Sequence, residues 1–467
     1  MIPCKLLRDI RLFAALCCLL AVLAACSVPS PSGTGVGQTP EPTKSNTRVP
    51  TVTPATSTTT TPATPTTVAA QTSCPAAGTA RAAVMPSLAL ASPANIVYTY
   101  QSFSSYQYQG QSYQDVTSYL KLYDVTSGAK NLIATIAHSR IDSYSATISP
   151  DGQWIMFETY TDVHPLSGFE FITVLQLVRI DGQYLQTLFC GTPLNASFPD
   201  DYVAATSWSP NQKLLLFNQL SIVQNRGTDL LYLLDLTSGN LQQEVQADQT
   251  NLASYNWLDN TRAFLSAHTG PPGSPGLLLL DTAKGQSQQE ASLQSLVKAG
   301  QPCQSYEISS DNAQLFVGQC NFDNNGVASG PSTLSVEPAT GGTLQTIFTS
   351  QHLAICSMET ISSTTLLLLV CNTTNTSQNG WWEIHIDGSG LTRLQAAGDY
   401  TMFLPIIGRD GNMYTLGTYH SGEQSLVVGT LNGGTPQSFA TTTSSQGEVD
   451  IVPRDAQRDW FLIDFVS

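Results

Sequence analysis

Five side chains in this sequence have the chemistry of an acid, a base or a metal ligand and lie in segments expected to connect strands. They are Asp162, His164, His268, Asp323 and His420. A carboxylate and an imidazole can exchange protons near neutral pH, and both can bind a divalent cation. Their spacing matches no metal-binding motif, and the sequence has no Gly-x-Ser-x-Gly elbow, phosphate-binding loop or dinucleotide fingerprint. We therefore expect no cofactor and no metal, and treat these five residues only as candidates for catalysis.

One of these segments also has the residue types of a calcium-binding loop. It reads Asp323-Asn324-Asn325-Gly326. It lacks the later bidentate glutamate that completes an EF-hand site, so a polar turn is the preferred interpretation.

A second set of residues is suited to contact with a partner. Tyr and Trp give a large contact area at small entropic cost, and their rings stack on sugars or peptide side chains. We predict a binding face made by Tyr106, Tyr108, Tyr113, Trp381, Trp382 and Tyr419. The alternative is that the Trp pair begins a strand, with one ring packed between sheets, and that the Tyr-rich segment is only solvated.

The elements that would position these residues are short strands around a recurring turn. Residues 148–157 read Ile-Ser-Pro-Asp-Gly-Gln-Trp-Ile-Met-Phe, in which Pro presets φ and Gly accepts a positive φ between two apolar strands. A second polar turn with Gly follows in each repeat. Related copies recur at intervals of 44 to 60 residues, around Pro93, Pro150, Pro210, Asp259, Ser310, Ser363, Arg409 and Pro453.

This repeat predicts an all-β fold, a β-propeller of four-stranded antiparallel blades. Eight copies of the first turn and seven of the second favour seven blades, with eight as the alternative. Residues 460–465 are expected to return to the first sheet and close the ring. A β-sandwich would need shorter intervals between its turns.

Residues 148–157 resemble the WD40-like (PD40) repeat of the TolB-type β-propeller, whose repeats centre on a Ser-Pro-Asp-Gly turn. The likeness spans residues 86–467, where one copy carries all four residues and the others keep two or three of them. The resemblance implies a propeller fold. Some TolB-like propellers precede a serine peptidase domain, and we expect no such catalytic half here, because the chain ends with its last expected strand.

The N-terminal residues have the pattern of an export signal. Basic residues at Lys5, Arg8 and Arg11 precede an uncharged apolar run that is too short for a spanning helix. The run ends in Leu-Ala-Ala-Cys26, which resembles the bacterial lipobox and implies that Cys26 carries lipid as the first residue of the mature chain. An ordinary secretion signal is the alternative.

The chain then divides into two further parts. Residues 26–73 are rich in Pro, Thr and Ser and predict a disordered tether, because such a segment cannot bury enough apolar surface to fold. Residues 74–467 are expected to form the propeller, as a monomer. The chain has 19 basic and 34 acidic residues and a net charge of −15, which argues against a nucleic acid partner.

Six cysteines follow Cys26. Cys303 and Cys320 bracket one copy of the turn, and Cys356 and Cys371 bracket the next at matching positions, which predicts two cross-strand disulfides. By elimination, Cys74 would pair with Cys190, with free thiols as the alternative for this pair. A zinc site is disfavoured because no Cys-x-x-Cys or nearby His is present.

Two functions from different classes remain. The first is a lipoprotein on the outer face of the cell membrane, or in the periplasm or outer membrane of a host with two membranes. Its propeller would be a binding or scaffold module for an envelope protein, a peptide or a cell-wall glycan. The alternative is an extracellular propeller enzyme of the lactonase, lyase or glycosidase type. Binding is favoured because it needs no catalytic group.

Overall fold

The structure is a computed structural model, and all the residues that it describes lie in one unit of the chain, Thr67–Leu462. They are residues 72–88, 95–108, 111–163, 170–191, 194–195, 201–223, 226–248, 252–267, 275–284, 293–298, 303–322, 328–371, 376–394, 405–408, 411–420 and 422–453. The expected signal, the tether up to residue 71 and Cys26 lie outside these residues. Among the described residues, none forms a helix with the length and apolar character needed to span a bilayer.

The first sheet in the described chain has nine strands, in the order β29-β1-β2-β4-β5-β6-β7, with β3 beside β2 and β8 beside β6. Its members are β1 (Asn95–Tyr108), β2 (Gln111–Asp124), β3 (Lys130–Ile136), β4 (Ser139–Ile148), β5 (Trp154–Val163), β6 (Glu170–Arg179), β7 (Gln186–Cys190), β8 (Leu194–Asn195) and β29 (Gly447–Ile451).

The other five described sheets have four antiparallel strands each, as expected for propeller blades. The second contains β9 (Asp201–Trp208), β10 (Leu214–Val223), β11 (Arg226–Asp235) and β12 (Leu241–Asp248), and the third β13 (Leu252–Trp257), β14 (Arg262–Ala267), β15 (Pro275–Asp281) and β16 (Leu293–Lys298). The fourth contains β17 (Cys303–Ile308), β18 (Gln314–Phe322), β19 (Ala328–Pro338) and β20 (Gln345–Ser350). The fifth contains β21 (Ile355–Ser362), β22 (Thr365–Val370), β23 (Gly380–His385) and β24 (Thr392–Arg393), and the sixth β25 (Ile406–Ile407), β26 (Met413–His420), β27 (Glu423–Thr430) and β28 (Gln437–Thr443).

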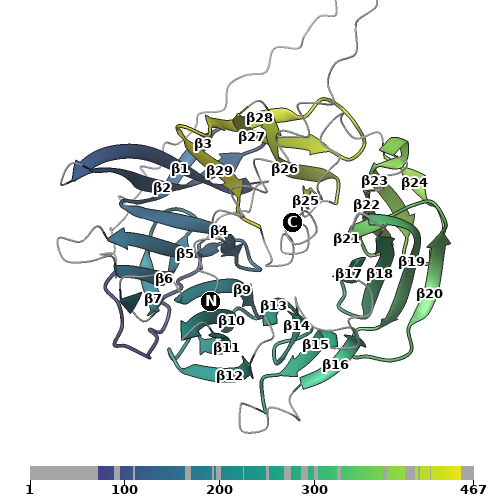
Figure 1. Ribbon diagram of the computed structural model, residues 1–467, viewed down its shortest axis with the longest axis horizontal. Coiled ribbons are helices and arrows are strands. Elements are labelled where there is room, and N and C mark those ends of the chain that lie inside the picture. The colour runs from purple at the N-terminus through teal and green to yellow at the C-terminus, as the bar shows by residue number, and fades with distance from the viewer. Residues whose placement is uncertain are drawn as a thin grey trace, which may run out of the picture. The chain divides into compact units, whose positions relative to one another are not determined.

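The fold is therefore all-β and a propeller, whose sheets follow one another around a ring (Figure 1). The expected number of seven blades, or eight, is wrong, because the described residues form five separate four-stranded blades and one nine-stranded sheet. A parallel bridge between Thr117 of β2 and Ser139 of β4 merges the first two repeats.

A buried serine lies beside this bridge. The Ser118 hydroxyl donates a hydrogen bond to the Ser139 carbonyl (2.8 Å) and accepts one from the Ile141 amide (3.0 Å). The two halves of the nine-stranded sheet still pack face to face, because Val97 and Phe157 belong to one apolar cluster.

The recurring turn forms as its residue types predict. Ser149 donates to the Asp151 carboxylate (2.6 Å) and accepts from the Trp154 amide (3.0 Å), while Gly152 takes a φ of 76°. The serine hydroxyl donates in the same way in two other copies of the turn, from Ser209 to Asn211 and from Ser309 to Asp311. These bonds hold the pKa of Asp311 below its ordinary value, with the Ser309 hydroxyl as the largest cause.

Apolar clusters between neighbouring sheets make the core. In most of them large side chains of two successive sheets pack together, and in one the two halves of the nine-stranded sheet do. Representative pairs around the ring are Phe189 with Phe217, Leu216 with Trp257, Phe264 with Tyr306, Phe316 with Leu366, Trp381 with Tyr414, and Phe439 with Tyr98.

The strand that closes the ring is β29, which pairs with β1 from Tyr98 to Ser102. Its continuation reaches the next hairpin as well, because the Ile148 amide donates to the Pro453 carbonyl (3.1 Å). Residues 460–465, also expected to return to the first sheet, lie outside the described residues.

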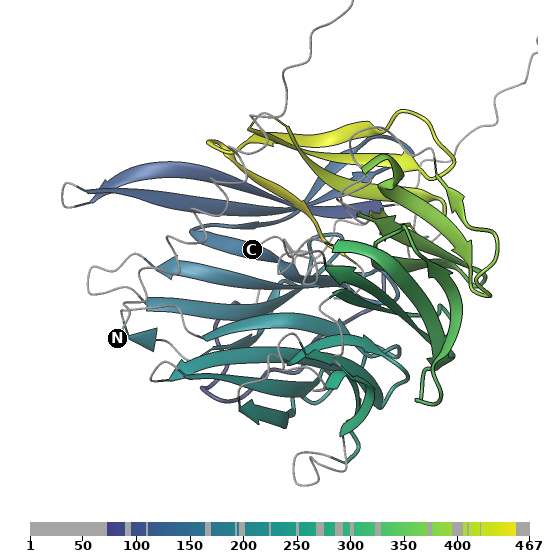
Figure 2. The ribbon, with the colours of Figure 1, turned by 45° about the vertical axis from the view of Figure 1, so that its right-hand side comes forward.

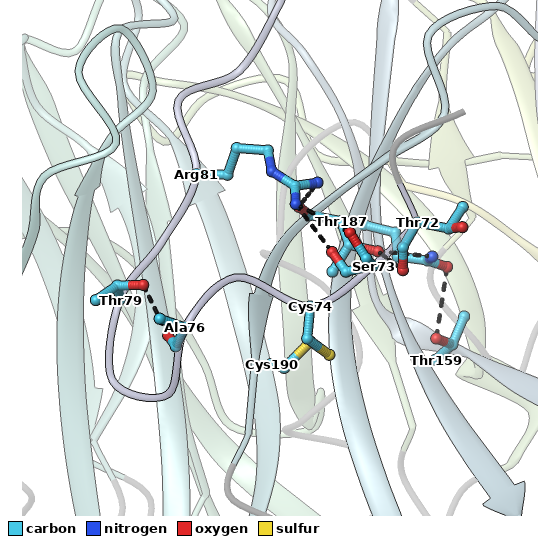
Figure 3. Close-up of a disulfide and its surroundings, with 10 residues drawn as sticks. Thr72, Ser73, Cys74, Ala76, Thr79, Arg81, Thr159, Thr187 and Cys190 are labelled. Atoms are coloured by element: carbon cyan, nitrogen blue, oxygen red, sulfur yellow. Dashed lines mark hydrogen bonds between the residues drawn. A yellow bond between two sulfur atoms is a disulfide. The ribbon is translucent and has the colours of Figure 1, made fainter. Parts of the chain in front are cut away.

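Residues 72–88 form a strap across the first two sheets. The Arg81 amide donates to the Leu188 carbonyl (2.8 Å) and the Ala83 amide to the Leu236 carbonyl (2.7 Å). Figure 3 shows Cys74 of the strap, which is bonded to Cys190 at the end of β7, and the Thr72 carbonyl, which accepts from the Thr187 hydroxyl (3.1 Å). The disulfide and these bonds fix where the preceding chain leaves the propeller.

One buried carboxyl group lacks the hydrogen bonds that usually compensate for burial. Glu244 is the extra residue of a bulge in β12, is fully buried, and neither of its oxygens has a hydrogen-bond partner within the described chain. Burial, helped by the nearby negative charge of Asp281, raises its pKa from 4.5 to about 7. The ionised form is thus disfavoured inside the fold.

This carboxyl group predicts a pH dependence of stability. In the unfolded chain Glu244 ionises near pH 4.5, whereas the folded chain holds the proton up to about pH 7. The unfolding free energy of the wild type therefore falls as pH rises between these values, because the unfolded chain releases the proton first. We expect Glu244→Gln to exceed the wild type in unfolding free energy by up to about 3 kcal/mol at pH 8 and to differ little at pH 4.5. Denaturant titrations at several pH values measure this, and a difference that does not change with pH contradicts it.

Candidate binding face

The longest hairpin, β1–β2, extends beyond its own sheet. The two strands pair from Asn95 with Asp124 to Tyr108 with Gln111, but β29 covers only Tyr98–Ser102 and β3 covers only Ser118–Tyr123. Figure 2 shows the tip of the pair standing clear of the neighbouring strands. We call residues 104–116 the ribbon, and its two edges have no neighbouring strand among the described residues.

The ribbon has an unusual composition for open edges. Its backbone places Tyr106 directly opposite Tyr113, with Tyr108 two positions farther along β1. Ser104, Ser105 and Gln107 are exposed. Natural proteins protect open edges with Lys, Pro or inward charges, and the ribbon has no Lys or Pro and one charged residue, Asp115. This element is therefore available for pairing with another chain.

Charged and aromatic side chains gather at the base of the ribbon. Arg140 of β4 lies over the Phe103 ring (5.4 Å to its centroid) and 3.8 Å from the Glu448 carboxylate of β29. The Asp115 carboxylate lies 2.9 Å from Nδ1 of His138, whose side chain is exposed. Sequence reasoning missed the Asp115–His138 pair, because the two residues come from different elements and no motif links them.

A second hairpin end adjoins this base. The amide of Ser444 donates to the Gly422 carbonyl between β26 and β27 (3.1 Å), and the amide of Phe103 donates to the Gln446 carbonyl (2.9 Å). Tyr419, near the end of β26, is 56% exposed. The base of the ribbon and this hairpin end are thus joined and form the candidate binding face.

The two Trp residues expected on this face lie elsewhere. Trp381 is 1% exposed, and its ring packs edge-on against Tyr414, with centroids 4.8 Å apart. Trp382 is half-buried, and its indole donates to the Gln378 carbonyl (2.9 Å). Trp381 is the second residue of β23 and its ring lies in the core between two sheets, as the alternative interpretation of the Trp pair expected for one of its rings.

The candidates for catalysis are not brought together by the described chain. His164, His268 and Asp323 lie outside the described residues. Asp162 is in β5, opposite Phe171, and His420 is in β26, opposite Glu423, so the two belong to different sheets. For none of the five does the structure describe a side-chain contact.

The three expected disulfides are all present. Cys74 bonds to Cys190, Cys303 to Cys320 and Cys356 to Cys371. Cys303 and Cys320 face each other in the β17–β18 register, as the symmetric positions in the sequence predicted. Three disulfides are consistent with an extracytoplasmic protein.

No family model matches the sequence, and no curated protein does. Among solved structures, the chain is similar to TolB from Acinetobacter baumannii, with 16% identity and a TM-score of 0.40 over 77% of this chain and 83% of that one. An oligogalacturonate lyase in complex with manganese has 8% identity and a TM-score of 0.46, covering 73% and 98%. The β-propeller domain of the trilobed protease from Pyrococcus furiosus has 10% identity and a TM-score of 0.44, covering 74% and 93%. At this identity such likenesses carry no functional argument.

The different placement of two aromatic residues predicts different effects on stability. Trp381→Ala opens a cavity in the core and should lower the unfolding free energy by about 3–5 kcal/mol. Tyr419→Ala removes an exposed ring and should change it by about 0.5 kcal/mol or less. Urea titrations of the two variants and the wild type measure this. Equal losses in both variants would contradict the assignment of Tyr419 to the surface.

Proposed function

We propose that the chain is a lipid-anchored lipoprotein outside the cytoplasm, whose TolB-like propeller, of the PD40 type, is a binding or scaffold module for an envelope protein, a peptide or a cell-wall glycan. The observation that carries this proposal is the ribbon. It is a Tyr-rich strand pair that extends past its sheet with both edges open, and Asp115 is its one charged residue. The lipobox-like residues before Cys26 support the anchor.

The open edges favour a polypeptide among these partners. An extended segment of a partner can add a strand to an edge, where main-chain hydrogen bonds give affinity and side-chain contacts give specificity. The Tyr residues of the ribbon would then add contact area at small entropic cost. A glycan that stacks on these rings is the other partner that the residue types allow.

The strap supports a scaffold role. Its disulfide and hydrogen bonds hold residues 72–88 on the first two sheets, so a tether from Cys26 would pull on a rigid point and leave the ribbon unstrained. An enzyme remains the second candidate because Asp115 and His138 form an exposed acid–base pair at the base of the same ribbon.

A capture experiment tests the binding role. The chain from Ser27 to Ser467 is crosslinked in an envelope extract and, separately, with cell-wall fragments, beside a Tyr106→Ala, Tyr113→Ala double variant. We expect one partner enriched by the wild type and lost by at least about tenfold in the double variant, since two aromatic contacts of about 1 kcal/mol or more are removed.

The matched control is Leu344→Ala, which removes a 40% exposed apolar side chain from the β19–β20 connection. This variant should capture the partner as the wild type does. No enrichment from either fraction, or equal capture by the double variant, would overturn the role of the ribbon. Turnover of a substrate that is lost on His138→Ala would favour the enzyme instead.

A further inference from the structure

The β1 edge of the ribbon continues the edge that β29 covers nearer the base. The Phe103 amide donates to the Gln446 carbonyl (2.9 Å), which extends the β1–β29 register by one residue pair. Main-chain groups of successive residues point alternately to the two sides of a strand. Ser105 and Gln107 therefore point their amides and carbonyls out of the ribbon, on the side where no described strand pairs with them.

This edge lacks the features that protect other outer edges of the fold. The pairs β11–β12, β15–β16, β19–β20 and β27–β28 each contain a register shift, whereas the β1–β2 pair has none. Residues 104–108 also contain no charged residue and no Pro. Bulges, charges and Pro are what keep natural edges from pairing with one another. The β1 edge is therefore suited to pair with a second edge.

We propose that the chain self-associates through this edge, so that β1 of one copy pairs antiparallel with β1 of a second copy. The inference goes beyond the proposed function, because it concerns contact between copies of the chain and needs no envelope partner. A two-fold axis makes such a contact self-complementary, since each strand offers the same groups to the other. The monomer expected from the sequence is then the dilute form.

The turn before β29 determines the register of this contact. Gln446 occupies the place opposite Phe103, so the second strand begins no closer to the base than Ser105. A two-fold axis at Gln107 meets this limit, because it brings the hairpin tip of the second copy opposite Ser105. An axis at Tyr106 would bring that tip onto Gln446 instead.

The register satisfies the outward groups at the axis. A hydrogen-bonded antiparallel pair exchanges two main-chain bonds, so the amide of each Gln107 donates to the carbonyl of the other. The neighbouring positions pair Tyr106 with Tyr108 of the second copy, and aromatic cross-strand pairs stabilise a sheet. The contact is short, so the association is weak and needs a high concentration of the chain.

Charge favours a second copy at this edge over a charged partner segment. The chain has a net charge of −15, so two copies repel each other wherever their acidic surfaces meet. The β1 edge brings no charge to the contact, and Asp115 of β2 is held by His138 between β3 and β4. Figure 2 shows the ribbon projecting from its neighbours, which allows two ribbons to meet while the propellers stay apart.

The contact leaves the β2 edge of the ribbon open. The odd-numbered residues of β2 bond to β1 in this register, so Ser112 and Gln114 point their main-chain groups to the opposite side. A polypeptide partner of the proposed function can add there while two copies are joined through β1.

Engineered thiols test the register directly. The probe is the purified chain from Ser27 to Ser467 carrying Gln107→Cys, oxidised by air at about 0.5 mM, where weak contacts of small area are populated. The two Cα atoms of a hydrogen-bonded antiparallel pair lie about 5.5 Å apart, which a disulfide spans.

The control for this variant is Ser105→Cys, an exposed position on the same edge. Its two copies would lie about 13 Å apart across the axis. We expect at least about tenfold more disulfide-linked dimer from Gln107→Cys, because the longer distance exceeds the reach of a disulfide. Equal yields from the two variants, or no dimer from either, would overturn the proposal.

Sedimentation equilibrium tests the association without a thiol. The mass should rise toward that of a dimer with concentration for the wild type and stay that of a monomer for Gln107→Pro, which removes an outward amide and leaves the β1–β2 ladder intact. Ser112→Pro removes an amide of the opposite edge and should associate as the wild type does. Far-ultraviolet circular dichroism verifies that each variant keeps its sheets.

Two results of this measurement would overturn the proposal. One is association of Gln107→Pro equal to that of the wild type, and the other is a monomeric wild type at every concentration. Neither result bears on capture of an envelope partner, which is measured separately and does not require two copies.

Discussion

The antiparallel pairing of β29 with β1 is the constraint on which the rest of the structure depends. Five residue pairs, from Tyr98 with Ile451 to Ser102 with Gly447, join the last described strand to the first. A ring of sheets has no free end only if such a pairing exists, since each sheet buries its faces on its two neighbours. Without it, the cluster of Tyr98, Tyr123 and Phe439 would be open to water.

The same pairing gives the ribbon a fixed base. Residues Tyr98–Ser102, just before the ribbon, are locked between β29 and β2. At their end the Arg140 guanidinium lies over the Phe103 ring, and the Phe103 amide donates a hydrogen bond to the Gln446 carbonyl in the turn before β29. The ribbon then extends from a rigid root. A binding element of this kind loses little conformational entropy when a partner adds a strand to it.

Side-chain hydroxyl groups fix the contacts between successive repeats. Ser118 and Ser332 make the same pair of hydrogen bonds, each to a carbonyl and an amide of the following repeat. Beside Ser118, a parallel bridge between Thr117 and Ser139 joins the two repeats into one sheet, whereas the sheets beside Ser332 stay separate.

Local chemistry explains what could be predicted from the sequence. The turn at Ser149–Gly152 and the disulfide of Cys303 with Cys320 follow from residue types within one repeat, so both were predicted. The number of blades was not, because a parallel bridge between Thr117 and Ser139 merges two repeats. Trp381 was misplaced because adjacent residues of a strand point to opposite faces and the sequence does not show which face is buried. The Asp115–His138 pair arises from a contact between two elements, for which no local pattern exists.

Hydrogen–deuterium exchange of the intact chain tests the role of ring closure most directly. If closure by β29 holds the fold, the amides of Gly447–Ile451 and of Tyr98–Ser102 should exchange as slowly as those of the central strand β5, and all three should be released together in denaturant. The outer edges of the ribbon should exchange quickly throughout. Rapid exchange of β29 and of its partner residues in β1, while β5 stays protected, would contradict this account.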